Sequence, residues 1–222
     1  MDAFKNVNRR HPLQNRVDPY GQLIRTPARG AWMGNRGLIH DENQRIVRAF
    51  RLKAWIICRL EFKSRHREVM TPNRYTELFF LDEATAFSAG HRPCAECRRE
   101  NYIRFKVAWL EGNPIYHFNL KTPIAKIDEI IHGERMDAHG RKVTHIARLD
   151  KLPVGAFIEQ NGRPFAVIGP NRIAAWTPTG YEQTMELSGE TEVSVLTPKS
   201  IIDMLLAGYK PQIAAQNALY VP

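Results

Sequence analysis

Three cysteines are the residues of this 222-residue chain whose spacing most clearly predicts chemistry. Cys94 and Cys97 form a C-x-x-C motif directly after Pro93, and two thiolates at that spacing can bind one tetrahedral metal ion. Cys58 lies on a separate segment, so a shared ion would join two distant parts of the chain. The sequence therefore predicts a metal centre, and cysteine ligands favour Zn²⁺.

A fourth ligand has to come from another residue type, because structural zinc sites hold four ligands. His66 follows Cys58 by eight positions and is the preferred candidate. His91 precedes Cys94 by three positions and is the alternative, as are a carboxylate, a water molecule or an open position. A thioredoxin-like redox motif is disfavoured, because a predicted short helix and Gly90 precede the motif instead of a buried parallel strand.

Residues 78–98 (LFFLDEATAFSAGHRPCAECR) resemble the metal-binding domain of the Ada DNA-methylphosphotriester repair family. That domain has a strand rich in aromatics, a short alanine-rich helix and an Arg-Pro pair before its C-x-x-C motif. The resemblance extends over residues 55–100, and the segment carrying Cys58 is similar to the one with the family's first cysteine. Residues 113–222 resemble only uncharacterised bacterial proteins.

The resemblance implies a zinc-binding fold in which Cys94 and Cys97 are ligands and Cys58 accepts a methyl group from a DNA phosphotriester. The family holds zinc with four thiolates, whereas this chain lacks the second cysteine. His66 falls near that position only if the loop is longer. A neutral imidazole in place of a thiolate leaves less negative charge on the metal, which weakens Cys58 as a nucleophile.

The formal net charge of +9 gathers in the first half of the chain. Residues 1–53 contain eleven basic and four acidic residues, whereas residues 113–222 contain eleven of each. A basic segment of this kind favours a nucleic-acid partner, with solvated surface charge as the alternative. The cations expected around the metal, and so expected to contact phosphates, are Lys63, Arg65, Arg67, Arg92, Arg98 and Arg99.

Three classes of function follow from these observations. The first is a zinc-dependent nucleic-acid-binding protein, with a role in handling DNA damage. The second is a zinc enzyme, either the methyl acceptor at Cys58 or a deaminase-like hydrolase that combines His40-Asp41-Glu42 with the later P-C-x-x-C motif. The third is a zinc-stabilised interaction module without a nucleic-acid role.

Composition predicts a cytoplasmic protein without a membrane-bound form. No apolar run approaches the length of a membrane span, and the first ten residues are polar and basic, unlike a secretory signal. The odd, low number of cysteines disfavours a disulfide framework.

The hydrophobic pattern predicts an α+β fold, with a zinc-clamped strand/helix module and a C-terminal mostly-β unit. We expect a basic N-terminal arm over residues 1–50, an Ada-like zinc module over 51–112, a helical connector over 113–150 and a small β-rich unit with a terminal helix over 151–222. Specific elements are strands over 54–62, 75–81, 173–176 and 193–196, a turn over 33–37, a hairpin over 156–168, and helices over 83–89, from Pro93, from Thr122 and over 199–207.

Overall fold

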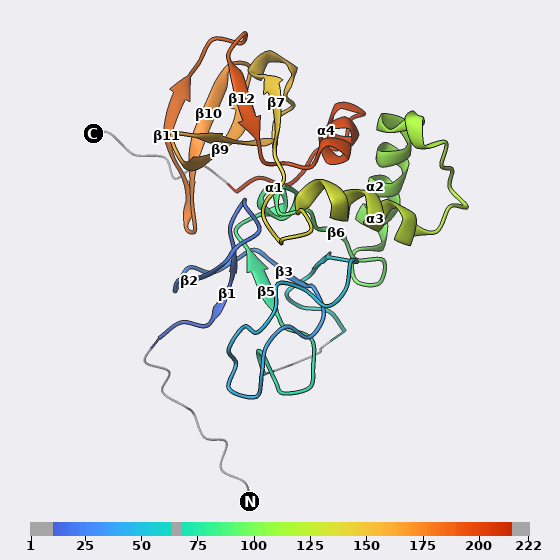
Figure 1. The fold of residues 1–222 in the computed structure, drawn as a ribbon, viewed down its shortest axis with the longest axis vertical. Coiled ribbons are helices and arrows are strands. Elements are labelled where there is room, and N and C mark those ends of the chain that lie inside the picture. Colours follow the sequence, from blue (N-terminus) through green and yellow to red (C-terminus); the bar gives the residue numbers. More distant parts are fainter. Residues whose placement is uncertain (1–10, 64–67, 215–222) are drawn as a thin grey trace, which may run out of the picture.

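The computed structural model describes residues 11–63 and 68–214, and within them the chain folds into two sheets with helices at their junction (Figure 1). The prediction of an α+β fold is confirmed. In these described ranges, no helix is both long and apolar enough to cross a membrane.

The first sheet has six short strands in the order β2-β1-β5-β3-β4-β6. Their bounds are β1 (Gln14–Val17), β2 (Leu23–Arg25), β3 (Trp32–Asn35), β4 (Ile56–Cys58), β5 (Leu78–Phe80) and β6 (Arg92–Pro93). The β1–β5 and β4–β6 pairs are parallel, and the other pairs are antiparallel. Gly34 in β3 is needed here, because a Cβ atom would meet the carbonyl oxygen of Ile56 and the ring of Phe80.

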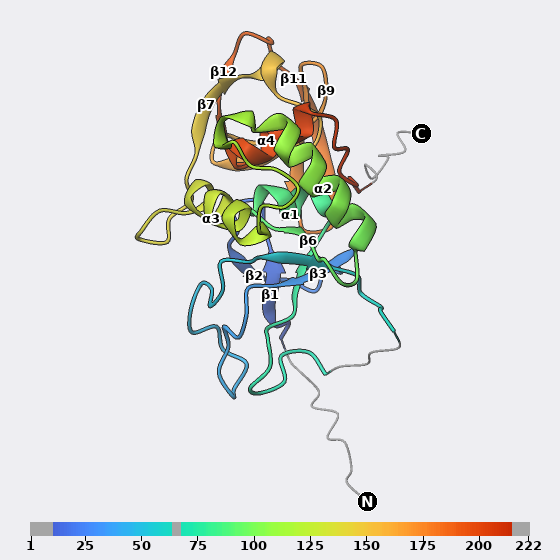
Figure 2. The same ribbon diagram turned by 90° about the vertical axis from the view of Figure 1, so that its right-hand side faces the viewer.

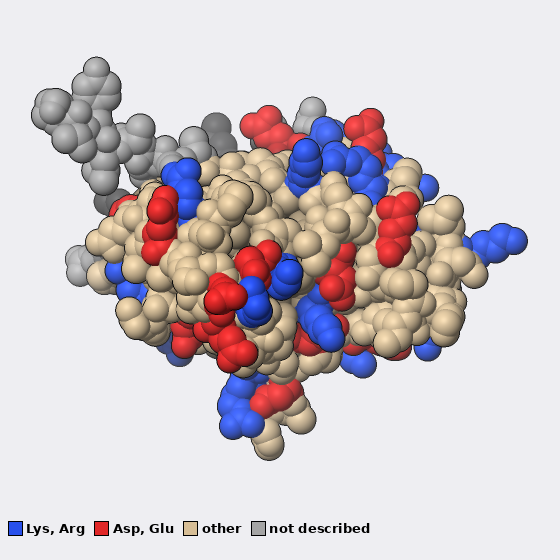
Figure 3. Space-filling view, turned by 90° about the horizontal axis from the view of Figure 1, so that it is seen from above, with Lys and Arg blue, Asp and Glu red and all other residues tan. Residues whose placement is uncertain are grey.

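The second sheet is antiparallel throughout, in the order β11-β10-β9-β8-β12-β7. Its strands are β7 (His145–Arg148), β8 (Phe157–Gln160), β9 (Arg163–Gly169), β10 (Arg172–Thr177), β11 (Gly180–Glu186) and β12 (Glu192–Val195). Asn161 and Gly162 join β8 to β9 with φ of 52° and 71°, as a two-residue primed turn requires. Figure 3 views the molecule from the end that carries this sheet, and acidic and basic side chains are interspersed over that surface.

The described residues form four α-helices, which lie between and beside the sheets (Figure 2). They are α1 (Glu83–Ser88), α2 (Arg99–Gly112), α3 (Ile124–Arg135) and α4 (Lys199–Leu206), and the short 3₁₀ helices are η1 (Pro114–Tyr116) and η2 (Leu149–Lys151). Phe87 of α1, Phe105 and Trp109 of α2 and Met204 of α4 belong to one buried cluster. Because α4 follows the second sheet in the chain, the two halves of the protein share a core.

The N-terminus of α1 also fastens the C-terminal segment. The side chain of Asp82 caps the helix by accepting a hydrogen bond from the amide of Thr85. Its other oxygen accepts hydrogen bonds from the Tyr181 hydroxyl at 2.6 Å and from the Ala214 amide at 2.9 Å. One buried carboxylate therefore links the first sheet, the second sheet and the end of the described chain.

Several predicted elements are confirmed. The helix over 83–89 forms with Asp82 as its cap, and Gly90 follows it with a φ of +79°. The hairpin turns at Asn161-Gly162, and the last helix ends before Gly208, whose φ is +102°.

Three local predictions are corrected. No helix begins at Pro93: residues 92–93 pair with β4, and α2 begins only at Arg99, after the turn that carries both cysteines of the motif. The expected turn over 33–37 overlaps β3. Residues 14–25, expected as irregular arm, contain β1 and β2, because they pair with each other and with β5.

Candidate metal centre

Two adjacent strands bring the three cysteines together. Cys58 is the last residue of β4, and Cys94 follows β6, the parallel neighbour of β4. The Cys94 amide donates a hydrogen bond to the carbonyl of Ile57 at 2.9 Å, which sets Cys94 beside Cys58. The chain then turns, and the Arg98 amide bonds the Cys94 carbonyl at 3.2 Å, returning Cys97 to the same point.

The three sulfur atoms all lie within 4.8 Å of one another. Cys58 and Cys97 are buried, and Cys94 is half-buried. Backbone amides also point at the sulfurs: those of Glu96 and Cys97 donate to Sγ of Cys94, the first at 3.4 Å, and that of Arg59 donates to Sγ of Cys97. Amide donors of this kind stabilise thiolates, so the backbone is arranged for negatively charged sulfur.

The proximity of the sulfurs makes their ionisation interdependent. Hydrogen bonds from the Cys58 and Cys97 thiols lower the pKa of Cys94 far below its usual value. The bond from Cys58 to Cys94 correspondingly raises the pKa of Cys58. Only a cation can hold three thiolates this close without strong mutual repulsion. The cluster can therefore bind a metal ion, and binding would release the remaining thiol protons.

A cavity of about 420 Å³ opens beside the sulfurs, and all three cysteines line it. Most of its remaining wall is apolar, including Met33, Phe62, Val69 and Phe79. Asn35, Arg59, Glu61 and Glu96 contribute polar groups. Asn35 and Arg59 are not among the site residues predicted from the sequence, although Arg59 directly follows a candidate ligand.

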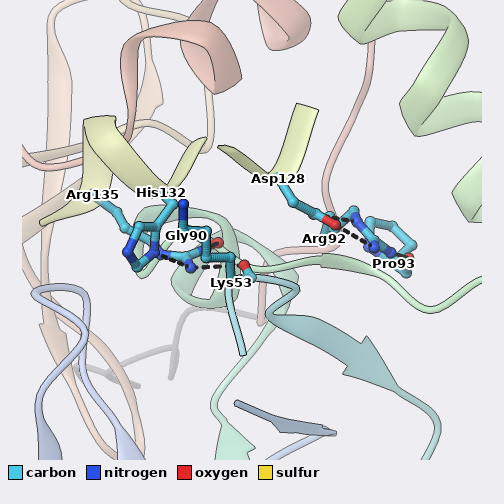
Figure 4. Close-up of polar contacts among 7 residues, drawn as sticks. All are labelled: Lys53, Gly90, Arg92, Pro93, Asp128, His132 and Arg135. Carbon is cyan, nitrogen blue, oxygen red and sulfur yellow. Dashed lines mark hydrogen bonds and ion pairs between the residues drawn. The ribbon is translucent and has the colours of Figure 1, made fainter. Parts of the chain in front are cut away.

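Two of the predicted phosphate-binding cations are buried in ion pairs, and for them the prediction is wrong. Arg92 bonds Asp128 of α3 at 2.7 and 2.8 Å, and the two side chains are each 7 % exposed (Figure 4). Arg98 bonds Glu83 of α1 at 2.6 Å, and its side chain is 2 % exposed. Both arginines hold helices in place and present no charge to a nucleic acid.

The other predicted cations have different positions. Lys63 and Arg99 are exposed. Arg65, His66 and Arg67 lie outside the described residues, so the preferred fourth ligand and two of the expected phosphate contacts remain predictions.

The alternative histidines do not join the cluster. The ring of His91 packs between Trp55 and Phe80, and its Nε2 accepts a hydrogen bond from Arg36. The two ring nitrogens of His40 face Thr76 at 2.6 Å and the Thr71 carbonyl at 3.3 Å. His40 is therefore occupied away from the cysteines, which removes the histidine that a deaminase-like site needs.

Comparison with protein-family models, curated proteins and solved structures finds no match to this chain. The resemblance to the Ada metal-binding domain therefore stays a prediction based on residues 55–100. The site itself consists of three convergent thiols, supported by backbone amides, at the edge of a cavity.

Proposed function

We propose that this chain is a zinc-binding protein whose ion is held by Cys58, Cys94, Cys97 and His66, and that it binds nucleic acid. The convergence of three sulfurs within 4.8 Å is the observation that carries the metal proposal. Zinc is favoured over harder ions because thiolates are soft ligands, and zinc accepts three of them with one imidazole.

The position of the cavity supports His66 as the fourth ligand. Phe62 and Val69 line the cavity together with the cysteines, so the chain enters and leaves the segment containing His66 at this cavity. A Cys₃His set is a standard structural zinc site. When bound, the ion would cross-link the edge of the first sheet to the turn that begins α2.

Metal analysis tests this proposal directly. Elemental mass spectrometry of the protein purified without chelator should find one zinc ion per chain. Most of this zinc should be lost in each of the variants Cys58→Ser, Cys94→Ser and Cys97→Ser. Ala95→Ser is the matched control, because it adds a hydroxyl group between two ligands without removing a thiol. His66→Asn should weaken zinc binding, whereas His139→Asn, at an exposed site, should not. Full zinc occupancy in the three cysteine variants would refute the proposal.

Nucleic-acid binding rests on the cations near the centre that remain exposed. Arg59 lines the cavity, and Lys63 and Arg99 lie close to the cysteines in sequence and are exposed. Phosphate contacts by such residues release counterions, so affinity should fall steeply as salt rises. The resemblance to a DNA repair domain points in the same direction.

Fluorescence anisotropy with labelled single-stranded DNA, duplex DNA and RNA tests the nucleic-acid part. A triple change of Arg59, Lys63 and Arg99 to glutamine should weaken binding and reduce the salt slope by about 3. The control replaces the exposed Arg163 and Arg172 of the second sheet by glutamine. Absence of binding at low salt would instead favour a zinc-stabilised interaction module.

Methyl transfer is the second candidate, because Cys58 lines the cavity and a ligand there could reach it. The Cys58 thiolate would attack the methyl carbon of a phosphotriester, the carbon–oxygen bond would break, and the phosphodiester anion would leave. Cys58 would gain one methyl group. Mass spectrometry of the protein after incubation with methylated DNA tests this, and an unmodified Cys58 peptide would exclude it.

A further inference from the structure

A second cluster of charged residues lies around the indole of Trp55, which directly precedes β4, whereas Cys58 is the last residue of that strand. The guanidinium of Arg36 stacks on the Trp55 ring at 3.7 Å, and that of Arg135 stacks at 3.6 Å. All three side chains are nearly inaccessible, at 2 to 3 % exposure. Two buried cations on one aromatic ring are costly unless their charge is balanced.

The hydrogen-bond partners of these cations are neutral. Arg135 donates to the carbonyls of Gly90 and Lys53, both at 2.8 Å, and its Nε has no partner within the described residues (Figure 4). Arg36 donates to the carbonyl of Gly21 at 2.9 Å. Lys142 donates to the carbonyl of Ser88 at 2.6 Å. The other partners are the neutral rings of His91, beside Arg36 at 3.3 Å, and His132, beside Arg135 at 2.7 Å. None of these partners carries a negative charge that would balance the cations.

Acidic residues in the described ranges do not balance this charge. Asp18 is the carboxylate that acts on Arg36 and Lys142. Asp128 acts on Arg135 but already forms the bidentate pair with Arg92. Burial lowers the pKa of Arg36 to about 9, of Arg135 to about 8 and of Lys142 to about 7. The lowered pKa values reflect the unfavourable free energy of burying these positive charges.

A cavity of about 570 Å³ opens over this cluster. Its wall includes Arg36, Arg135 and Lys142, the exposed Arg48, and the β1–β2 turn around Gly21. The volume is in the range of small-ligand sites, about 300–1,000 Å³. Because both faces of the Trp55 ring are covered by guanidinium groups, this ring cannot stack on a nucleobase.

We propose that this cavity is a binding site for a small phosphorylated molecule, whose phosphate is held by Lys142 and Arg48 above the buried guanidinium groups of Arg36 and Arg135. A phosphomonoester carries close to two negative charges at neutral pH, which matches three inner cations facing one carboxylate. The site is separate from the metal centre, and it stands or falls independently of the proposed zinc and nucleic-acid functions.

Titration calorimetry and thermal denaturation at constant ionic strength test the proposal. The probes are inorganic phosphate, glucose 6-phosphate and adenosine 5′-monophosphate, with glucose, adenosine and sodium chloride as controls. We expect at least one phosphomonoester to raise the melting temperature and to bind more tightly than inorganic phosphate, while the controls have no effect. Equal effects of phosphate compounds and sodium chloride would overturn the proposal.

Variants place the binding in this cavity. The pair Arg48→Gln and Lys142→Gln should weaken phosphomonoester binding at least tenfold, and Arg48→Gln alone, at an exposed position, should weaken it measurably without affecting folding. The double Arg163→Gln and Arg172→Gln control should bind normally. Unchanged affinity in the folded Arg48→Gln protein, or an oligonucleotide that binds this cavity while phosphomonoesters fail to compete, would refute a small phosphorylated ligand.

Discussion

Replacing Glu83 by glutamine should be among the most destabilising single changes in this protein. The carboxylate of Glu83 accepts hydrogen bonds from Arg98 at 2.6 Å, from the Tyr209 hydroxyl at 3.0 Å and from the Gln212 amide at 3.1 Å. Arg98 has no other ion-pair partner in the described chain, and its Nε and Nη1 are buried without a hydrogen bond. Its remaining stabilising contact is the ring of Trp32 at 3.9 Å.

The magnitude follows from the uncompensated charge. Removing one member of a buried ion pair costs about 3–5 kcal/mol, because the other charge stays buried. Glu83→Gln should therefore lower the free energy of unfolding by about 4 kcal/mol in urea denaturation. The control is Glu129→Gln, which breaks an exposed pair with Lys126 and should cost less than about 1 kcal/mol.

A double-variant cycle separates the charge effect from the loss of hydrogen bonds. Arg98→Met removes the cation, so the Glu83→Gln/Arg98→Met protein contains neither buried charge. It should be more stable than the Glu83→Gln protein by about 2 kcal/mol, because the uncompensated cation is gone. Two results would refute the reasoning about the buried charge. One is a loss of unfolding free energy for Glu83→Gln no larger than that for Glu129→Gln. The other is a double variant that is destabilised by the sum of the Glu83→Gln and Arg98→Met effects.

Three further predictions follow from other parts of the structure. Removing the metal with a chelator should lower the melting temperature and increase hydrogen exchange at residues 56–60 and 92–98, and added Zn²⁺ should restore both; unchanged exchange in these segments would contradict the metal cross-link. The affinity of sulfate for the cavity beside Trp55 should fall about tenfold from pH 6 to pH 8. Over this range Lys142, whose pKa is lowered to about 7 by burial and by Arg135 and Arg36, loses its proton, and Asp18, whose pKa is raised to about 6 by burial, becomes ionised. Lys142→Gln should flatten this dependence, and a flat profile in the unaltered protein would exclude the charge assignment. Gly34→Ala should destabilise the protein by about 3 kcal/mol in urea denaturation, because its Cβ would meet the Ile56 carbonyl and the Phe80 ring, whereas Gly169→Ala, with open space around it, should cost much less.

The sequence predicted what local rules determine. Asp82 and Gly90 bound α1, and Asn161-Gly162 form the hairpin turn, because capping and positive φ depend on single residues. The cysteine cluster was also predictable, because thiols are few in this chain and the C-x-x-C spacing is informative.

Long-range pairing was not predictable in the same way. Arg92 and Arg98 look like surface cations in sequence, and only the packing of α3 and α1 supplies the buried carboxylates Asp128 and Glu83. Pro93 suggested a helix start, but its neighbours pair with β4, a strand more than thirty positions earlier. The charge cluster around Trp55 gave no signal, because its members are spread from Asp18 to Lys142.

The anchoring of α1 has a consequence for synthesis on the ribosome. Asp82 and Glu83 are made about a hundred residues or more before their partners at Tyr181, Tyr209 and Ala214. The three cysteines, by contrast, are complete once residue 97 has emerged, so the cluster can bind a metal ion while Asp82 and Glu83 still lack these distant partners. We expect the first sheet to become metal-loaded early, and the whole molecule to become resistant to proteases only after the final segment has docked.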